Sequence, residues 1–354
     1  MLHDRPLRIE VLVNSPGPHD QVRVRDPFTA LQRQGIDCRI HERPFLFSRC
    51  IRPHSLVIWQ RPLPDSWKRQ YEHLQWLRER GCLLFTEWDD HPDLFPQSIR
   101  RQLSATAFAP LELCHALHSS SAVLVRALAS HQPLGLVLEN GPADVPPLNL
   151  RKQFVRPLRV FIGNQNRQGD HFTMVRALRD WLQADPRLQI VCVGDDVLAS
   201  ALPSHRCERH PRLHYPAYRQ LLRSCQMALL PLSLGLPNRC KTVIKWAEAA
   251  AESVVVVAGP ELYGAVKCDA GGVPTAEVVP ALQALVPAAR ALASNPEQRM
   301  ALAAHAHRWV NDDWCLRRLL PQRLELYRRI WARRAQLDQR LCERLAKRAS
   351  LLQL

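Results

Sequence analysis

The stretch MALLPLSLGLPNRCKTVIKWAEAAAESVVVVAG (residues 227–259) contains a short apolar run, a loop rich in Gly and Pro, a segment of helical spacing and a second apolar run. Apolar runs of this length, bounded by turn residues, are typical of strands buried on both faces. The stretch therefore predicts a strand, a helix and a second strand of a parallel α/β sheet. A helix that begins near Lys241 would pack an apolar stripe on that sheet, formed by Val243, Ile244, Ala247, Ala250 and Ala251.

A second stripe on this helix is charged and consists of Lys241, Lys245, Glu248 and Glu252. Positive charge in the first turn of a helix costs about 0.3–1 kcal/mol per residue because of the helix dipole. A bound diphosphate would remove this cost, since the free N–H groups and the lysines would surround it. Glu248, about two turns on, could accept hydrogen bonds from the ribose of the same nucleotide. The alternative is a solvated helix face, but ligands of α/β proteins bind at the carboxyl ends of strands, where this loop lies.

The same alternation of apolar strands and helices occurs twice along the chain. RIEVLVN (8–14) opens the first series, and PLRVFIGNQNRQGD (157–170) opens the second after a Pro- and Asn-rich linker. We therefore expect an α/β protein with two Rossmann-like domains, at 1–150 and 151–315, whose parallel sheets face an inter-domain cleft.

The remaining sequence is helical in pattern. Residues 280–310 predict one helix, a break at Asn295–Pro296 and a second helix. The segment 316–354 predicts a basic C-terminal helix that packs partly back on the first domain.

The net charge of +15 indicates an anionic partner. Eleven Lys and Arg against three acidic residues lie between Arg317 and Arg348, so about half of the excess is in the C-terminal segment. Nucleic acid is not expected, because the basic residues are not interleaved with aromatic residues on a strand platform. Nucleotide phosphates and an acidic membrane surface remain as partners.

The eleven cysteines are scattered singly without a C-x-x-C pair, which fits neither a disulfide framework nor a zinc site. Cys207 lies near three histidines (His205, His210 and His214), but a second ligand pair at metal spacing is missing, so we expect no metal. The apolar run near the N-terminus is too short for a signal peptide, and no run approaches 18 apolar residues. These features predict a cytoplasmic protein that is at most peripheral at the inner face of a membrane.

Residues 227–259 resemble the donor-binding domain of GT-B glycosyltransferases of the family 4 (group 1) type, in which a strand, a loop, a K-x-x-E-A helix and an apolar strand follow one another. FIGNQNRQGDHFTMVRAL (161–178) and HYPAYRQLLRSCQMALLPL (214–232) are similar to other passages of that domain. EWDDHPDLFP (87–96) and LVLENGPAD (136–144) resemble passages of the acceptor domain, and the resemblance spans residues 8–315.

The resemblance implies a set of donor-binding residues and no cofactor or metal beyond the nucleoside-diphosphate sugar itself. The set is Gly163, Asn164, Arg167, Asn238, Lys241, Thr242, Lys245 and Glu248. Many family members carry a second glutamate eight residues before the one that matches Glu248, but this chain has Cys240 there. This departure leaves the stereochemistry of transfer open.

On the acceptor side, four ionisable residues directly follow a predicted buried strand: Glu87, Asp89, Asp90 and His91. They are the candidates for acid or base catalysis at an acceptor hydroxyl, although Asp residues also cap helices and form turns. The N-terminal glycine-rich loop of the family is reduced to Gly17, and Arg23 or Arg25 could supply positive charge there or be exposed residues at a helix start.

The sequence thus predicts a hexosyltransferase-like enzyme that moves a sugar from a nucleoside-diphosphate sugar to an acceptor hydroxyl in glycan, lipopolysaccharide or other cell-envelope polysaccharide synthesis. The alternatives are a GT-B sugar-nucleotide epimerase and a non-catalytic nucleotide-sugar-binding protein, the latter suggested by Cys240. The basic segment 316–354, with Trp314 and Trp331 expected to be exposed, could hold the protein at an anionic membrane that carries a lipid-linked acceptor.

Overall fold

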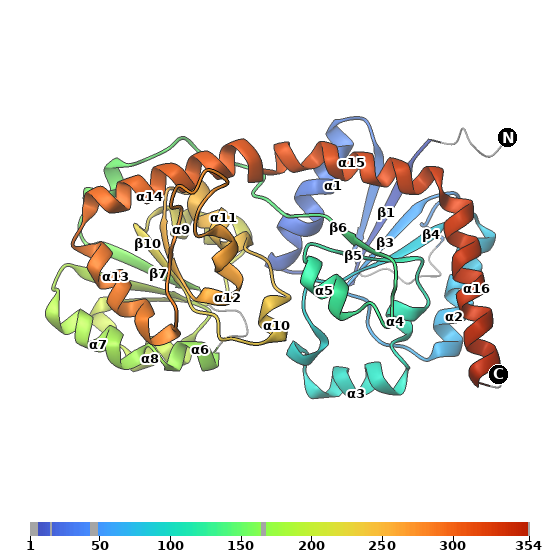
Figure 1. Ribbon diagram of the computed structural model, residues 1–354, viewed down its shortest axis with the longest axis horizontal. Helices are drawn as coiled ribbons and strands as arrows, with labels where there is room; N and C mark the ends of the chain where they lie inside the picture. The colour runs from blue at the N-terminus through green and yellow to red at the C-terminus, as the bar shows by residue number, and fades with distance from the viewer. Residues whose placement is uncertain (1–5, 15, 43–48, 164–167, 353–354) are drawn as a thin grey trace. The chain divides into compact units, whose positions relative to one another are not determined.

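The chain forms two compact units in the computed structural model, which describes residues 6–14, 16–42, 49–163 and 168–352. Unit 1 comprises Met1–Asn140 and Leu319–Leu354, and unit 2 comprises Gly141–Arg318. Each unit contains one six-stranded sheet with parallel neighbours, so the predicted α/β architecture with two parallel sheets is confirmed (Figure 1).

The sheet of unit 1 has the strand order β2-β1-β3-β4-β5-β6. Its strands are β1 Arg8–Val13, β2 Asp37–Glu42, β3 Leu56–Gln60, β4 Leu83–Glu87, β5 Ala116–Ser119 and β6 Gly135–Val137. Its helices are α1 Asp26–Arg33, α2 Trp67–Glu79, α3 Gln97–Ala105, α4 Ala109–Glu112, α5 Ala122–Ala127, most of α15 Leu316–Ala332 and all of α16 Arg334–Leu352.

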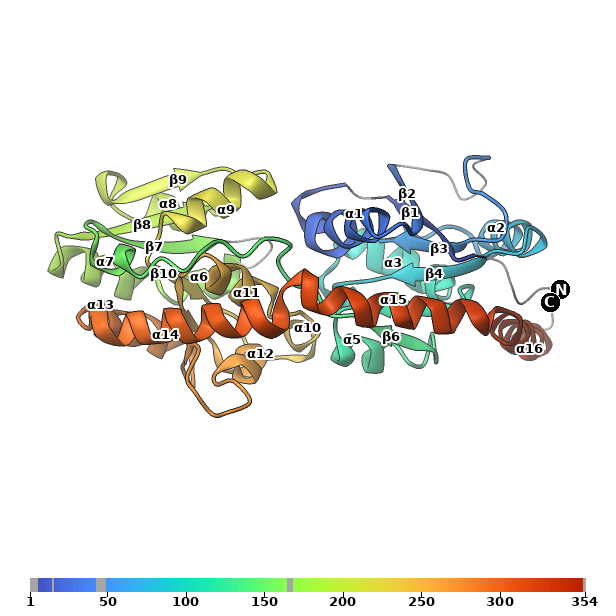
Figure 2. The ribbon, with the colours of Figure 1, turned by 90° about the horizontal axis from the view of Figure 1, so that it is seen from above.

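The sheet of unit 2 has the order β12-β11-β10-β7-β8-β9. Its strands β7, β8, β9 and β10 are labelled in Figure 2. Its strands are β7 Leu158–Gly163, β8 Leu188–Val193, β9 Cys207–His210, β10 Met227–Leu230, β11 Val255–Ala258 and β12 Glu277–Val278. Its helices are α6 Gln168–Phe172, α7 Val175–Ala184, α8 Asp196–Ala201, α9 Tyr215–Arg223, α10 Leu236–Arg239, α11 Ile244–Ala251, α12 Pro260–Tyr263, α13 Leu285–Ala293 and α14 Pro296–Trp309.

The central strands β10 and β11 of unit 2 are apolar at every position because both faces of the sheet are covered. In β8, Ile190 and Cys192 pack with α7 and α13 on one face, whereas Val191 and Val193 pack with α9 and α11 on the other. This arrangement explains the continuous apolar runs of the sequence. The predicted break at Asn295–Pro296 is also confirmed, because the Asn295 side chain accepts a hydrogen bond from the Gln298 amide and caps α14.

The helix of the 227–259 stretch begins later than the sequence predicted. α11 starts at Ile244, and a separate short helix, α10, precedes it. The expected start near Lys241 was wrong because the Lys241 amide donates to the Asn238 carbonyl (3.1 Å) and closes a turn between the two helices. The predicted apolar face nevertheless packs in the core of unit 2, where Val243, Ala247, Ala250 and Ala251 are buried and Ile244 is partly buried.

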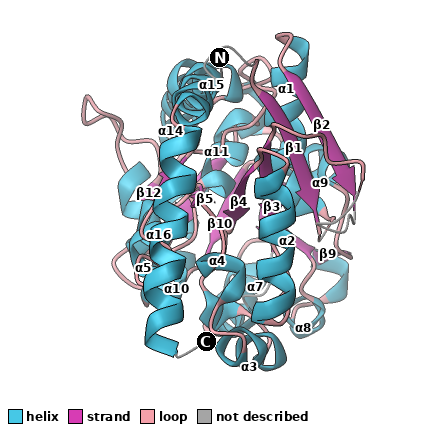
Figure 3. Cartoon of the chain, turned by 90° about the vertical axis from the view of Figure 1, so that its right-hand side faces the viewer, coloured by secondary structure: helices cyan, strands magenta, loops and turns pink. Residues whose placement is uncertain are grey.

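The C-terminal segment packs closely within unit 1. α16 lies beside α2 (Figure 3), where Leu341 enters the core and the Arg78 guanidinium pairs with Asp338. The expectation of exposed tryptophans was wrong: Trp331 is buried, and Trp314 is half-buried against Trp246. Among the described residues, no helix is both long and apolar enough to cross a bilayer.

Because three cysteine thiols are buried in the core, we expect the folded protein to lose stability at alkaline pH. Burial raises the pKa of Cys38, Cys114 and Cys192 to about 12. Below pH 9 the thiols are protonated in both states, and above it only the unfolded chain releases their protons. The free energy of unfolding should therefore fall by about 1.4 kcal/mol per pH unit per thiol between pH 9 and 12. Lys152 has the opposite effect on the free energy of unfolding above pH 8. Burial lowers its pKa to about 8, so the folded chain releases this proton before the unfolded chain does.

The pH dependence of denaturant unfolding measures this effect. Cys114→Ala should lose about 1.4 kcal/mol per pH unit less than the wild type above pH 9, whereas Cys50→Ala, which removes an exposed thiol, should follow the wild type. Parallel slopes for Cys114→Ala and the wild type would contradict the assignment.

Candidate functional site

The loop after β10 in unit 2 is held by polar contacts. Asn238 Nδ2 donates to the Ser233 carbonyl (3.1 Å) and to the Ser233 hydroxyl (2.9 Å). Gly235 has a φ of 130°, which only glycine adopts without strain. Asn238, expected to bind the donor, thus uses its amide nitrogen to shape the loop that precedes Lys241.

The turn between α10 and α11 holds Lys241 and Thr242, which are both half-buried. Lys245 follows in the first turn of α11, and its Nζ donates to the carbonyl oxygen of Gly163 (3.1 Å). Because Gly163 is the last residue of β7, this bond joins the carboxyl end of one strand to the helix that follows its neighbour, β10. Two positive side chains and a helix N-terminus thus lie at one edge of the sheet, which suits an anionic ligand.

Glu248 lies further along α11 and is 6% exposed. The Tyr218 hydroxyl, from α9, donates to Glu248 Oε2 (3.1 Å). Burial raises the pKa of Glu248, while Arg219 and the hydroxyls of Tyr215 and Tyr218 oppose that rise. Burial and the Glu248 charge also raise the pKa of both tyrosines well above 10, so they remain hydrogen-bond donors at neutral pH.

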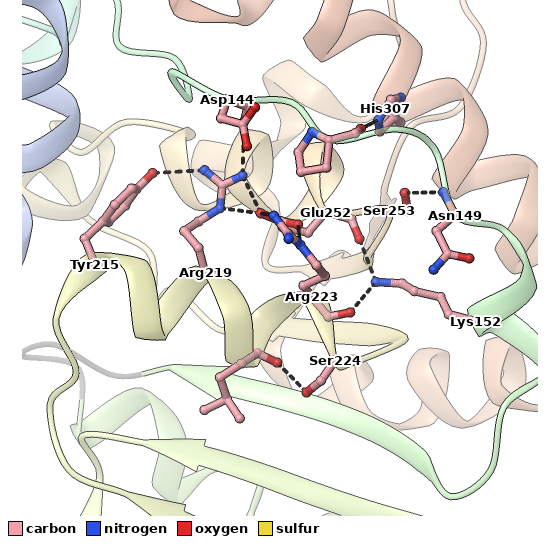
Figure 4. Close-up of polar contacts among 12 residues, drawn as sticks. Asp144, Asn149, Lys152, Tyr215, Arg219, Arg223, Ser224, Glu252, Ser253 and His307 are labelled. Carbon is pink, nitrogen blue, oxygen red and sulfur yellow. Dashed lines mark hydrogen bonds and ion pairs between the residues drawn. The ribbon is translucent and has the colours of Figure 1, made fainter.

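Glu252, which the sequence grouped with Glu248, belongs to a separate ion network (Figure 4). Its carboxylate accepts from Arg219 Nε (2.8 Å) and from Arg223 Nε (2.6 Å), and its side chain is 1% exposed. Lys152 Nζ donates to the Glu252 carbonyl (2.6 Å), and Arg219 also donates to the Asp144 carbonyl (3.2 Å). Glu252 therefore joins α9 and α11 to the segment that enters unit 2.

Two other features bear on the donor residues. Cys240 stands where the resemblance leads us to expect a second glutamate, and it is completely buried. Asn164 and Arg167, which the sequence assigned to the donor, lie outside the described residues.

In unit 1, the carboxyl ends of β3 and β4 bring together an ion cluster. Arg23, in the turn before α1, pairs with Asp89 and lies 3.5 Å from Glu87 Oε2. Arg61, directly after β3, donates through Nε to Asp89 Oδ1 (2.7 Å) and contacts Asp90 (3.4 Å). Burial and the neighbouring Arg23 lower the pKa of Arg61 to about 10. Asp89 is therefore shared by two arginines.

The remaining acceptor-side candidates have local partners. The Asp93 amide donates to His91 Nδ1 (3.2 Å), so the cap of the turn Pro92–Leu94 is His91 rather than one of the Asp residues. Arg25 pairs with Asp20 (3.2 Å) and with Glu42 (2.6 Å). Gly17 N–H donates to the Asp20 carboxylate (3.4 Å).

The interpretation of Arg23 as an exposed residue at a helix start is wrong, because Arg23 is 5% exposed beneath Asp89. Arg25, the other residue in that interpretation, is half-buried by its two carboxylate partners.

Several polar residues near these clusters were not singled out from the sequence. Arg61, Tyr215 and Tyr218 have been described; in unit 1, His118 and Tyr327 form a further buried pair, with Nε2 and the hydroxyl 3.0 Å apart. Burial, with Arg323 and Arg23 nearby, lowers the pKa of His118 well below 6.5. The only sequence signal for Arg61 was its position directly after an apolar strand. Within the described residues, no group of three His, Cys, Asp or Glu side chains could hold a metal ion.

Comparison with known proteins identifies the fold. HepE of Anabaena, solved with UDP and glucose, is 15% identical, with a TM-score of 0.61 over 90% of this chain and 99% of that chain. A glycosyltransferase from Rickettsia africae is 13% identical (TM-score 0.61; 92% and 98%). Sucrose-phosphate synthase from Thermosynechococcus elongatus is also 13% identical (TM-score 0.62; 92% and 99%). No protein-family model and no curated protein matches the chain. The chain therefore has the GT-B fold, shared with glycosyltransferases of low sequence identity.

Proposed function

We propose that this chain is a glycosyltransferase that moves a sugar from a nucleoside-diphosphate sugar to an acceptor hydroxyl. Its fold matches that of HepE over nearly the whole of both chains, and HepE has been solved with UDP and with UDP-glucose. A uridine diphosphate sugar is accordingly the first donor to test.

The observation that carries the proposal is that a lysine-containing turn and a buried carboxylate occur together at the carboxyl edge of the unit 2 sheet. The half-buried Lys241–Thr242 turn opens α11, and the buried Glu248 carboxylate follows on the same helix. A diphosphate at the turn would accept hydrogen bonds from the N–H groups there and from the Lys241 ammonium. Glu248 would accept hydrogen bonds from ribose hydroxyls, with the Tyr218 hydroxyl holding its carboxylate in place.

This arrangement supplies the main requirement of transfer, which is stabilisation of the negative charge on the departing nucleoside diphosphate. Lys241 and the N-terminus of α11 provide positive charge where it develops, and Lys245 fixes the helix to the end of β7. Gly163, Asn164, Arg167 and Asn238 complete the proposed donor set. With Cys240 buried, no carboxylate at that position takes part.

On the acceptor side we assign the acid or base role to the segment 87–91, with Asp90 as the first candidate for the base. Asp89 is engaged by two arginines, Glu87 is almost fully buried, and His91 uses Nδ1 as a cap. Asp90 is the most exposed carboxylate of this segment, with a side chain that is 19% exposed against 16% for Asp89 and 2% for Glu87. Arg23, Arg25 and Gly17 would shape this side without contacting the reacting atoms.

The acceptor class we favour is a glycan or lipid-linked chain of the cell envelope, used at the cytoplasmic face of a membrane. The support is a set of exposed basic residues in the C-terminal segment: Arg328 and Arg329 on α15, Arg333 between the two helices, and Arg340 and Lys347 on α16. Since Trp331 is buried and Trp314 half-buried, attraction to anionic lipid would be electrostatic and would weaken with salt.

A panel of nucleoside-diphosphate sugars tests the proposal through thermal unfolding. A ligand present at about 100 times its Kd stabilises the folded state by about 2.7 kcal/mol, and we expect this shift for the sugars of one nucleotide base. Release of the nucleoside diphosphate should then follow when a suitable acceptor is added. If no member of the panel raises the melting temperature, the proposal is wrong.

The replacement at Cys240 favours one second candidate, a protein that binds a nucleotide sugar without transferring it. Binding without release of the nucleoside diphosphate in the presence of membrane and glycan acceptors would support that candidate over transfer.

A further inference from the structure

The loop that precedes Lys241 has little apolar anchorage of its own. Leu234 is 71% exposed and Leu236 is 41% exposed, so burial of these two leucines does not fix the conformation of residues 233–239. Gly235 between them has a φ of 130°, a conformation that needs a specific restraint.

The restraint comes from the neighbouring strand connection. Glu261 lies on α12, which follows β11, the strand next to β10. Its Oε2 accepts a hydrogen bond from the Gly235 amide (2.7 Å), and its Oε1 pairs with Arg239 Nε (3.1 Å). One carboxylate thus holds the first residue before α10 and the last residue of α10.

Backbone hydrogen bonds carry this restraint onward to the proposed donor turn. The amides of Arg239 and Cys240 donate to the carbonyls of Gly235 (3.0 Å) and Leu236 (3.0 Å), and the Lys241 amide donates to the Asn238 carbonyl (3.1 Å). The position of the Gly235 amide therefore sets the start of α10 and, through it, the turn at Lys241–Thr242.

The segments that follow β10 and β11 are also closely packed, which supports the role of Glu261 as the restraint on the loop. A Cβ added to Gly259, two residues before Glu261, would lie 2.9 Å from the Leu232 carbonyl oxygen. The chain after β11 therefore passes directly against the chain after β10, and Glu261 is built into that contact.

We propose that Glu261 is a positioning residue that holds the loop 233–239, and with it the Lys241–Thr242 turn, in the conformation that receives the donor diphosphate. The proposal rests on the proposed function for the identity of the ligand, but the restraint itself is a property of the ligand-free chain. The essential contact is the one to the Gly235 amide, because the ion pair with Arg239 is half-exposed (50% for Arg239) and such pairs contribute little.

Three variants separate the two contacts. Glu261→Ala removes both and should weaken binding of the preferred nucleoside diphosphate about tenfold, as expected for the loss of one charge-assisted hydrogen bond. Glu261→Gln keeps an oxygen that accepts from Gly235, and Arg239→Ala removes only the ion pair, so both should bind within about threefold of the wild type. Glu208→Ala is the matched control, since Glu208 pairs with Arg159 (2.7 Å) in the same unit away from the loop.

Hydrogen exchange of the ligand-free protein provides the readout that a general loss of stability would not reproduce. Amides of residues 235–241 should exchange faster in Glu261→Ala and not in Glu208→Ala or Glu261→Gln. Wild-type exchange in Glu261→Ala, or an Arg239→Ala variant that matches Glu261→Ala in exchange and binding, would overturn the proposal. If the exchange result holds and the wild type binds no nucleoside diphosphate, the restraint stands and the proposed function fails.

Discussion

Replacing Lys241 with alanine is expected to weaken binding of the nucleoside-diphosphate donor about ten- to a hundredfold. Hydrogen bonds to charged groups contribute about 1.5–3 kcal/mol, and the ammonium would face two phosphate groups at the start of α11. Titration calorimetry measures the loss of affinity.

The matched control for Lys241→Ala is Lys267→Ala, which removes the same charge from an exposed position in unit 2. It should change the affinity less than threefold, and less still at high salt, because exposed charges beyond the Debye length are screened. Equal losses in the two variants would mean that the net charge of the protein, rather than a contact at α11, attracts the nucleotide.

The architecture could be predicted from the sequence because parallel sheets impose a strong pattern. Strands such as β10 and β11 are buried on both faces, so they are apolar at every position and stand out between helices of amphipathic spacing. The beginning of α11 could not be predicted to the residue. It depends on backbone bonds inside the loop, which sequence periodicity does not record, such as that from Lys241 to Asn238.

For the candidate site, the sequence indicated which ionisable residues to consider but not which of them pair with one another. Glu87 and Asp89 were recognised as ionisable residues after a strand, and Arg23 as a source of positive charge in the N-terminal loop. Their mutual ion pairs depend on which strands are neighbours. Arg61 is a stronger case, because its φ of 45° is rare for a residue with a side chain and turns the chain at the point where it pairs with Asp89. The sequence grouped Glu252 with Glu248 because of their spacing. It did not show that Glu252 pairs with two arginines, because these arginines come from another helix, α9.

The second large effect is therefore expected at Glu252, on stability rather than on binding. Glu252→Ala leaves the guanidinium of Arg219, whose side chain is 9% exposed, without its carboxylate partner. Removing one member of a buried ion pair costs about 3–5 kcal/mol, because the remaining charge is desolvated and uncompensated. For a unit of this size the melting temperature should fall by roughly 6–20 °C. Differential scanning calorimetry measures the shift.

Glu248→Gln is the comparison that gives the Glu252 result its meaning, because the two glutamates are four residues apart on the same stretch of chain and both are buried. Burial raises the pKa of Glu248, so the fold already disfavours its charge, and an amide of the same shape should leave the melting temperature within about 2 °C of the wild type. The same substitution replaces one ribose acceptor oxygen with a donor and should weaken nucleotide binding about tenfold. Glu252→Gln should show the reverse pattern, with lower stability and unchanged affinity per folded molecule. If Glu248→Gln were the destabilised variant, or Glu252→Gln the one that lost affinity, the assignment of one glutamate to the ligand and the other to the fold would be reversed.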